Sequence, residues 1–185
     1  MLHLMRHGEP AVAGRLLGRT DDPATDAGIA ACVARAGGLA VERIEASDMI
    51  RARACAEAIG VPEGVPVLVD RRWRELDFGA WDGLAPAAID PVELAAFYED
   101  PDASPPPHGE RWSALQDRVR QALVAMPPVS TLVVTHGGAI RAALADLCGF
   151  DQRQSWAFDL PYAALVSLRV WPTPTRTVQI VGLAT

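Results

Sequence analysis

The sequence lacks any long uninterrupted hydrophobic run, although 50% of its 185 residues are hydrophobic. A membrane-spanning helix needs roughly 20 consecutive apolar residues, and the apolar stretches here are much shorter. Arg6 brings a charge too close to the N-terminus for a secretory signal peptide. We therefore expect a cytoplasmic protein without membrane association, folded as one domain over residues 1–185.

Cysteine is scarce. Cys32, Cys55 and Cys148 are scattered, and each lies in an alanine-rich stretch that favours a helix. Three cysteines without regular spacing do not indicate a disulfide framework. The sequence also has no Cys/His spacing typical of a metal site. We expect structural thiols in a reducing compartment, with no metal and no cofactor.

Excess positive charge is also absent, because 17 basic residues stand against 23 acidic ones and the net charge is −6. Proteins that bind nucleic acids usually present a basic surface, so we expect no nucleic-acid partner. Net charge does not describe a local site, however. A few cations could still converge on a small anion.

Two stretches share one design, in which a short apolar run leads into histidine and glycine. They are Leu2–Gly8, which contains Arg6 and His7, and Thr131–Gly138, which contains His136. Apolar residues followed by glycine predict a buried strand that breaks into a loop or helix. If both strands are central and parallel, both histidines reach the sheet edge where α/β proteins bind ligands. The helix that follows would offer free backbone N–H groups to an anion.

The rest of the chain alternates between helical and extended patterns. Helices are predicted at about Thr25–Ala36, Met49–Ile59, Pro86–Tyr98, Trp112–Met126 and Gly138–Leu147. Further strands are predicted at Ile44–Ser47, Val65–Val69, Tyr162–Val170 and Thr177–Val181, with a turn at Pro172 and Pro174. This alternation predicts a three-layer α/β/α domain with a mostly parallel central sheet.

Further motifs follow in a set order. Ser47-Asp48-Met49-Ile50-Arg51-Ala52 precedes Cys55-Ala56, Trp73–Gly83 includes Arg-Glu-Leu and Phe-Gly-Ala-Trp-Asp-Gly, and His108–Arg111 opens the next helix. Together with Leu-Met-Arg-His-Gly at 4–8 and His136, this series resembles the histidine phosphatase (phosphoglycerate mutase-like) superfamily over about residues 2–141. The resemblance implies a phosphoglycerate mutase-like fold.

The resemblance also implies a role for each matching residue. His7 would be the nucleophile, forming a transient phosphohistidine, and Glu75 would protonate the leaving group. His136 would assist catalysis. Phosphate binding would fall to four residues: Arg6, Arg51, His136 and Gly137. Planar guanidinium groups match phosphate oxygens, so the transfer requires no metal. The protonation state of Glu75 stays open.

The loop at 11–23 departs from the family pattern. Some members place an asparagine there to contact the phosphate, and this chain has Ala13 at about that point. Arg15, Arg19 or Thr20 could replace the contact. Of these, Arg19 and Thr20 are our candidate substrate contacts, although loop residues beside a site are often only solvated.

The lid-like segment, about residues 76–110, is shorter than expected for a mutase, which must shield its phosphoenzyme from water. This favours hydrolysis of a small phosphomonoester. The Glu75–Gly83 run and the Trp156-Ala-Phe segment most resemble the α-ribazole phosphatase branch, so α-ribazole 5′-phosphate is one candidate substrate. A phosphoglycerate mutase, a phosphohistidine-type protein phosphatase and a non-catalytic phosphate-binding regulator remain alternatives. A homodimer is left open.

Overall fold

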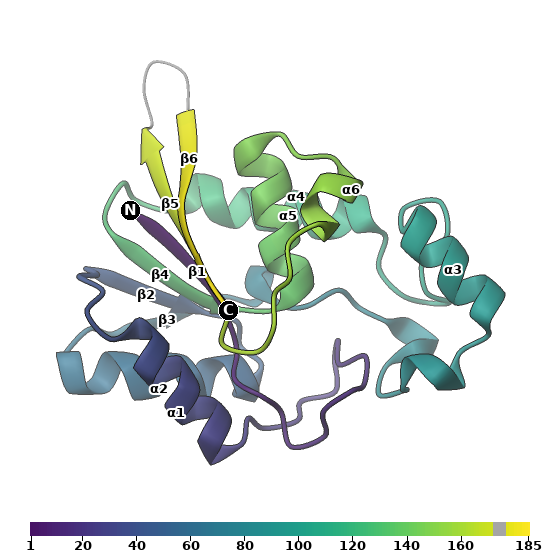
Figure 1. Ribbon diagram of the computed structural model, residues 1–185, viewed down its shortest axis with the longest axis horizontal. Helices are drawn as coiled ribbons and strands as arrows, with labels where there is room; N and C mark the ends of the chain where they lie inside the picture. The colour runs from purple at the N-terminus through teal and green to yellow at the C-terminus, as the bar shows by residue number, and fades with distance from the viewer. Residues whose placement is uncertain (172–176) are drawn as a thin grey trace.

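The computed structural model describes residues 1–171 and 177–185, and its centre is one mixed sheet of six strands (Figure 1). The spatial order is β3-β2-β4-β1-β5-β6. The strands are β1 (Leu2–Arg6), β2 (Arg43–Ala46), β3 (Val67–Val69), β4 (Thr131–Thr135), β5 (Leu165–Trp171) and β6 (Thr177–Ala184). The first four are parallel, β5 is antiparallel to β1, and β6 is antiparallel to β5. The turn predicted at Pro172 and Pro174 lies outside the described residues.

Helices cover both faces of this sheet, which confirms the three-layer prediction (Figure 1). The helices are α1 (Asp26–Ala36), α2 (Ile50–Glu63), α3 (Pro91–Glu99), α4 (Trp112–Ala125), α5 (Gly137–Cys148) and α6 (Gln152–Trp156). Helices α1 and α2 pack on one face, and α4 and α5 pack on the other. Single 3-10 turns occupy Arg71–Trp73, Gly79–Trp81 and Pro86–Ala88.

Alternation of side chains along the central strands builds two hydrophobic cores. On β1, Leu4 joins the core under α4 and α5, whereas its neighbour Met5 joins the core under α1 and α2. On β4, Val133 and Val134 divide in the same way, and all four side chains are fully buried. Successive residues of a strand point to opposite faces, so a strand covered on both sides is apolar at every position. This explains the consecutive apolar residues at 4–5 and 132–134. The buried polar residues beside them are hydrogen-bonded, as His3 is to Ser167 and Thr135 is to the carbonyl oxygen of Trp73.

Two predicted helix boundaries were wrong. Helix α2 does not end at Ile59 but continues through Pro62 to Glu63, where Gly64 caps it in the left-handed conformation (φ 68°). A proline in the last turn leaves the earlier hydrogen bonds of the helix intact. Gly60 does not terminate the helix either. Glycine is needed at this position because a Cβ atom would lie 2.6 Å from the carbonyl oxygen of Val65.

The helix predicted over Pro86–Tyr98 is broken into a 3-10 turn and α3. Asp90 stops the first piece and caps the second, accepting hydrogen bonds from the N–H groups of Val92 and Glu93. Pro91 begins α3, a position where the missing proline N–H is not needed. Helix α6 was not predicted, although Asp151 and Gln154 form a capping box, a pattern that the sequence contains.

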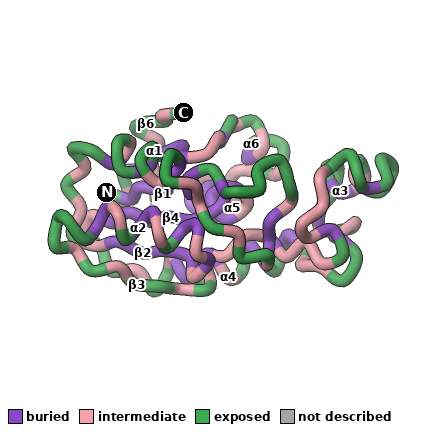
Figure 2. Tube along the Cα trace, turned by 90° about the horizontal axis from the view of Figure 1, so that it is seen from below, coloured by how far each residue is buried: buried purple, intermediate pink, exposed green. Residues whose placement is uncertain are grey.

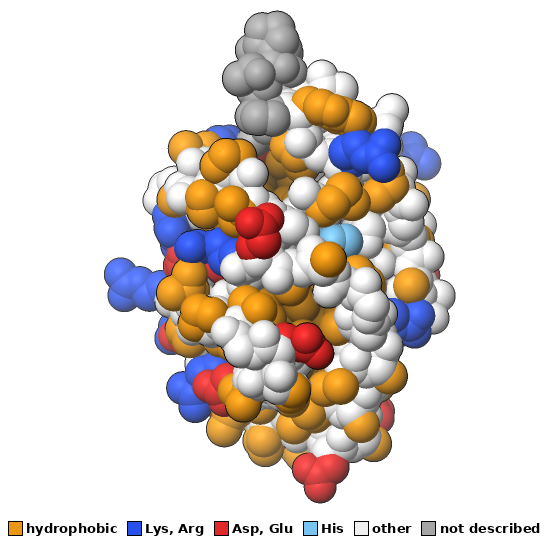
Figure 3. Space-filling model, turned by 90° about the vertical axis from the view of Figure 1, so that its left-hand side faces the viewer, with side chains coloured by type: hydrophobic (Ala, Val, Ile, Leu, Met, Phe, Trp, Pro, Cys, Tyr) orange, Lys and Arg blue, Asp and Glu red, His pale blue; other side chains and the backbone are white. Residues whose placement is uncertain are grey.

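The lid-like segment lies at one end of the molecule. Figure 2 shows the buried chain concentrated around the sheet, whereas α3 lies out at that end, beyond α4 and α5. On the face shown in Figure 3, acidic and basic side chains are interspersed with hydrophobic ones. No helix in the described part of the chain is long and apolar enough to cross a membrane.

Candidate active site

The parallel register of β1 and β4 brings the two predicted histidines together. Arg6 pairs with Thr135, so His7 and His136, one residue further along each strand, leave the same sheet edge. Their ring centroids are 5.0 Å apart, in an edge-on arrangement. The backbone after β1 runs against the start of α1, where a Cβ atom on Gly8 would overlap the backbone of Gly28. Glycine is therefore required directly after His7.

The hydrogen bond of His7 determines which ring nitrogen is available. Nδ1 of His7 lies 2.7 Å from the carbonyl oxygen of Gly8. A carbonyl oxygen only accepts hydrogen bonds, so Nδ1 carries the proton and Nε2 keeps its lone pair. Burial lowers the pKa of His7 to about 3, assisted by the charges of Arg51 and Arg6 and opposed by the Gly8 hydrogen bond. The imidazole is therefore neutral near pH 7, as a nucleophile must be.

His136 is fully buried, and Ser47 orients it. Oγ of Ser47 lies 2.9 Å from Nε2 of His136 and accepts a hydrogen bond from the N–H of Met49. The bond to Ser47 fixes the orientation of the ring and engages Nε2. Nδ1 is buried and has no partner among the described residues. Burial, followed by the charge of Arg51, holds the pKa of His136 well below its usual value.

Sequence reasoning did not assign a role to Ser47. The signal was present, because Ser47 opens the Ser-x-x-x-Arg motif that supplied Arg51. Only the adjacency of β2 and β4 in the sheet places Ser47 beside His136, 89 residues away in the chain.

The two predicted arginines converge on the histidines from different elements. Arg51, on α2, is completely buried and donates to the backbone oxygens of Thr20 and Leu17 at 2.8 and 2.7 Å. Arg6 ends β1 and donates to the carbonyl of Leu160 at 2.6 Å, with its guanidinium 4.2 Å from the centroid of the Tyr162 ring. The Nε atoms of both arginines are buried without a partner in the described part of the chain.

Glu75 lies at the N-terminus of α5, as the predicted proton donor should. Its carboxylate accepts hydrogen bonds from the N–H groups of Gly138 (3.0 Å) and Leu76 (2.8 Å). A Cβ atom on Gly138 would overlap Oε1 of Glu75. Gly137 is the first residue of α5, and the position of a Cβ atom there would be 3.9 Å from both Arg6 Nε and Glu75 Oε2. The helix N-terminus thus faces the same space as the side chains.

The backbone that carries Glu75 is held by Arg118, on α4. Arg118 donates to the carbonyl oxygens of Arg72 (2.8 Å), Arg74 (2.7 Å) and Glu75 (2.9 Å), and it forms a largely buried ion pair with Glu110 (2.7 Å). The motif His108–Arg111 contains Glu110, but the sequence did not predict that Glu110 and Arg118 would hold the segment of Glu75. This arrangement depends on the packing of α4 against the 3-10 turn before Glu75.

The loop at 11–23 uses its polar side chains internally. Asp82 accepts hydrogen bonds from three loop N–H groups and from the hydroxyl of Thr20 at 2.6 Å. Arg19 pairs with Asp77 at 3.2 Å. The side chains of Arg19 and Thr20 therefore bond to Asp77 and Asp82 of this chain. Arg15 instead lines the cavity beside His7. Trp73 is buried in the core, with Nε1 donating to Glu45, so it does not shape access to the site.

A cavity of about 100 Å³ lies against His7, Arg6 and Glu75. Its lining residues are Arg6, His7, Pro10, Arg15, Leu16, Leu17, Glu75, Phe78 and Tyr162. The space suits a phosphoryl group and a few more atoms. In the described part of the chain, no group of three or more His, Cys, Asp or Glu side chains could hold a metal ion.

Comparison with known proteins agrees with this geometry. A glucosyl-3-phosphoglycerate phosphatase of Mycolicibacterium vanbaalenii is 33% identical over 172 residues, covering 80% of this chain and 74% of the relative. A protein of Erwinia tasmaniensis assigned as a phosphoglycerate mutase, GpmB, is 30% identical over 160 residues with the same coverage. The chain is therefore similar both to a phosphatase and to a protein assigned as a mutase.

Solved structures show the same fold. Mycobacterial glucosyl-3-phosphoglycerate phosphatase in complex with VO3 superposes with a TM-score of 0.86 at 28% identity, covering 98% of this chain and 97% of that one. A candidate α-ribazole-5′-P phosphatase of Escherichia coli K-12 gives a TM-score of 0.82 at 22% identity, covering 97% of this chain and 94% of that one. At that identity the second likeness shows the fold alone.

A family model for the histidine phosphatase superfamily (branch 1) matches residues 2–181, which is nearly the whole chain. The match includes both histidine segments, both buried arginines and Glu75. The chain belongs to this superfamily, and its enzymatic class is that of the superfamily's metal-independent phosphatases.

Proposed function

We propose that the protein hydrolyses small phosphomonoesters through a phosphohistidine on His7. The observation that carries this proposal is the state of His7, which is neutral, has a free Nε2 lone pair and lines a cavity together with Arg6 and Glu75. A neutral imidazole with its other nitrogen anchored is a competent nucleophile. Phosphoryl transfer requires little else from a protein beyond positioning and charge stabilisation.

In the first step, Nε2 of His7 attacks phosphorus as the bond from phosphorus to the leaving oxygen breaks. Glu75, in its protonated form, delivers a proton to that oxygen, so an alcohol departs. Arg6 and Arg51 balance the charge on the equatorial oxygens. The Nδ1–H of His136 and the N-terminus of α5, at Gly137, are further donors in reach of the same oxygens.

In the second step, water attacks the phosphohistidine. The Glu75 carboxylate takes a proton from the water, the N–P bond breaks and inorganic phosphate leaves. The lone pair returns to Nε2 of His7. Glu75 acts as the acid in the first step and as the base in the second. Both His7 and Glu75 line the cavity.

The substrate is proposed only as a class. A cavity of about 100 Å³ takes a phosphoryl group, so the leaving group must extend past Leu16, Phe78 and Tyr162 at its walls. Small phosphorylated metabolites are the size that such a site admits, and α-ribazole 5′-phosphate remains one candidate. Phosphoglycerate esters are a second candidate class, because the mycobacterial relative is a glucosyl-3-phosphoglycerate phosphatase.

A mutase is the second candidate function, favoured by the 30% identity to the GpmB protein of Erwinia tasmaniensis. We propose that the lid-like segment 76–110 leaves the phosphohistidine open to water, so that hydrolysis dominates. Incubation with 3-phosphoglycerate distinguishes the two functions. Release of inorganic phosphate supports a hydrolase, whereas accumulation of 2-phosphoglycerate in excess of phosphate would establish the mutase.

The mechanism is tested with an aryl phosphate in the presence of EDTA. We expect the wild type to release phosphate and His7→Ala to be inactive, with loss of at least about a thousandfold in kcat. Quenching wild-type turnover in alkaline denaturant should trap phosphate on the protein in a base-stable form that later acid treatment releases. Equal activity of wild type and His7→Ala would exclude the phosphohistidine route. Tight phosphate binding without turnover would instead identify a non-catalytic regulator.

A further inference from the structure

A third guanidinium group, that of Arg141, lies at the site and has no part in the mechanism above. Arg141 follows His136 by five positions on α5. The position of a Cβ atom on Gly137 would be 3.2 Å from Nη1 of Arg141 and 3.9 Å from both Arg6 Nε and Glu75 Oε2. Arg141, Arg6 and Glu75 therefore border the same space beside Gly137.

The hydrogen-bonding capacity of Arg141 is mostly unused. Nη2 donates to the carbonyl oxygen of Phe158 at 3.1 Å, and Nε is buried without a partner among the described residues. None of the ion pairs within the described ranges includes Arg141, so no carboxylate of this chain neutralises it there. Burial lowers its pKa, which the charge of Glu75 partly opposes. A half-buried cation with free donors is a binding group for an anion.

The charges at the site leave room for a second anion. Arg6, Arg51 and Arg141 carry three positive charges, and both histidines are neutral. A phosphomonoester dianion supplies two negative charges, and Glu75 must be protonated at the moment of transfer. Asp21, Asp22 and Asp82 act on Arg51 from a distance and Asp159 acts on Arg141, but none of the ion pairs among the described residues includes either guanidinium.

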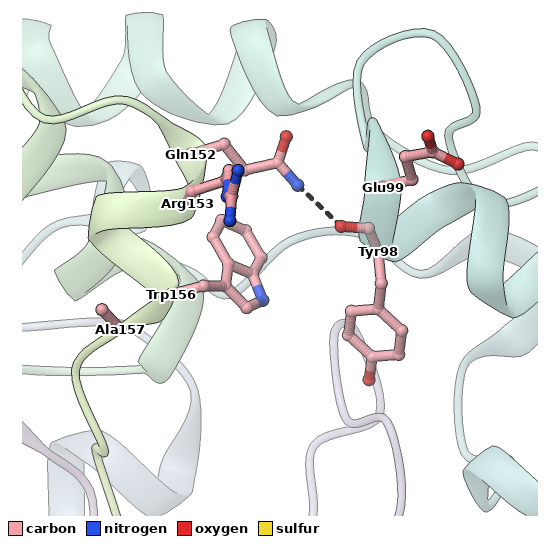
Figure 4. Close-up of a pocket in the computed structure, with 6 residues that line it drawn as sticks. All are labelled: Tyr98, Glu99, Gln152, Arg153, Trp156 and Ala157. Atoms are coloured by element: carbon pink, nitrogen blue, oxygen red, sulfur yellow. Dashed lines mark hydrogen bonds between the residues drawn. The ribbon is translucent and has the colours of Figure 1, made fainter.

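Arg141 is also accessible from outside the catalytic cavity. Its guanidinium lies 5.5 Å from the centroid of the Trp156 ring. Trp156 forms one wall of an open pocket of about 580 Å³ between α6 and α3, and Tyr98 forms the opposite wall (Figure 4). In Figure 4 the Gln152 side chain bonds to the Tyr98 backbone, joining the two walls. Arg141 therefore lies between Trp156, at the wall of this pocket, and the residues around Gly137.

We propose that Arg141 is a specificity-determining residue that binds a carboxylate on the leaving group, so that the preferred substrates are phosphorylated hydroxy acids. This inference rests on the proposed function and names its substrate class. The planar guanidinium matches a carboxylate in geometry, and its position beside Glu75 places that carboxylate near the oxygen that leaves.

The test compares two esters that differ only in the acid group, 3-phosphoglycerate and glycerol 3-phosphate. We expect the wild type to favour 3-phosphoglycerate by about 10- to 100-fold in kcat/KM, the range for a hydrogen-bonded charge pair. The preference should fall to about threefold or less in Arg141→Gln and be largely restored in Arg141→Lys, which keeps the charge. Arg15→Gln, which removes the other arginine of the cavity wall, should leave the preference in place.

Several outcomes would overturn the proposal. These are a wild type without preference for the acid, an unchanged preference in Arg141→Gln, and a preference lost in Arg15→Gln instead. A purely structural role for Arg141 predicts equal losses on both esters and therefore an unchanged ratio. Phenyl phosphate hydrolysis that depends on His7 is measured alongside, because its absence would refute the proposed function and not the role of Arg141.

Binding provides a second measurement that needs no turnover. Calorimetry with phosphonoacetate and methylphosphonate compares a phosphonate with and without a carboxylate. We expect the wild type to bind phosphonoacetate more tightly by about tenfold and Arg141→Gln to bind both about equally. Equal affinities in the wild type would contradict the proposal even if the Arg141→Gln variant failed to fold.

Discussion

At the scale of single residues, the chemistry depends on how each histidine uses its two ring nitrogens. In His7 one nitrogen is bound to the backbone of the next residue, and in His136 one nitrogen is bound to Ser47. The remaining nitrogen of His7 is a free lone pair, and the remaining nitrogen of His136 is buried without a partner among the described residues. Burial keeps both rings neutral, because a desolvated imidazolium among arginines is unfavourable.

The lowered pKa of His7 predicts a pH-dependent stability. An unfolded histidine binds a proton below about pH 6.5, whereas folded His7 does not bind one until about pH 3. The unfolded state therefore holds more protons across this window, and the free energy of unfolding falls as pH decreases through it. Between pH 7 and 4.5, wild type should lose about 2–3 kcal/mol more than His7→Gln, which has no titrating ring. Urea denaturation at the two pH values measures the difference.

His108→Gln is the matched control for this experiment. His108 lies in an exposed loop, and its replacement should leave the pH dependence of the wild type unchanged. If His7→Gln destabilised with falling pH as steeply as wild type, His7 would not be the buried neutral group that the structure indicates.

At the scale of elements, the proton donor depends on a helix that does not contain it. Glu75 lies in an irregular segment, which has no hydrogen-bond ladder of its own. Arg118 on α4 supplies three hydrogen bonds to the carbonyls of residues 72–75, and Glu110 neutralises the guanidinium. The guanidinium of Arg118 thus replaces the backbone hydrogen bonds that would hold a residue in a strand.

Replacement of Arg118 by methionine should therefore damage both stability and proton transfer. We expect a loss of about 2–3 kcal/mol, because Glu110 is left largely buried without a partner. The kcat for an alkyl phosphate should fall at least about tenfold more than the kcat for 4-nitrophenyl phosphate, whose leaving group needs less protonation. Urea denaturation and the ratio of the two kcat values test this prediction.

Arg53→Met serves as the control, since Arg53 lies on α2 and its ion pair with Glu57 is exposed on both sides. Exposed pairs contribute little, so neither stability nor the kcat ratio should change appreciably. Similar effects of the two substitutions would show that Arg118 acts as a general helix charge and not as a clamp.

The elements also show where sequence patterns were reliable. The strands at 2–5 and 131–135 were recognised because a strand buried on both faces has consecutive apolar residues, here at 4–5 and 132–134. The start of α1 was recognised because Thr25 caps it, accepting from the N–H of Gly28. The end of α2 was missed, because Gly60 is small for packing against Val65 and a proline is tolerated in a final turn.

At the scale of the whole molecule, an acidic chain holds a basic site. The net charge is −6, and all 17 basic residues are arginine. Three of these arginines converge where β1, α2 and α5 meet, and no ion pair of the described residues neutralises them. Folding thus leaves a buried positive charge that an anion is needed to balance, so anion binding and global stability should be linked.

Inorganic phosphate should therefore raise the melting temperature. At about ten times its Kd, a ligand that binds only the folded state adds about 1.4 kcal/mol, or about 3–5 °C for a chain of this size. The increment should largely disappear in Arg6→Gln. Calorimetric scans with phosphate and with potassium chloride at equal ionic strength separate binding from screening. An equal shift with both salts would argue against a phosphate site.

The sequence alone determined the layers and supplied the candidate catalytic residues. Binary patterning specified which strands are buried on both faces, and the order of motifs identified His7, His136, Arg6, Arg51 and Glu75 as candidates. These inferences depend on local periodicity and on residue type. Both are properties of short stretches of chain.

Only the tertiary structure decided how those residues are held. Ser47 reaches His136 across the sheet, Arg118 clamps the segment of Glu75 from another helix, and Arg141 reaches Glu75 from the first turns of α5. Such contacts join residues far apart in the chain, and no periodicity within one stretch records them. The protonation state of His7 also depends on the tertiary structure, because the burial that lowers its pKa exists only in the folded molecule.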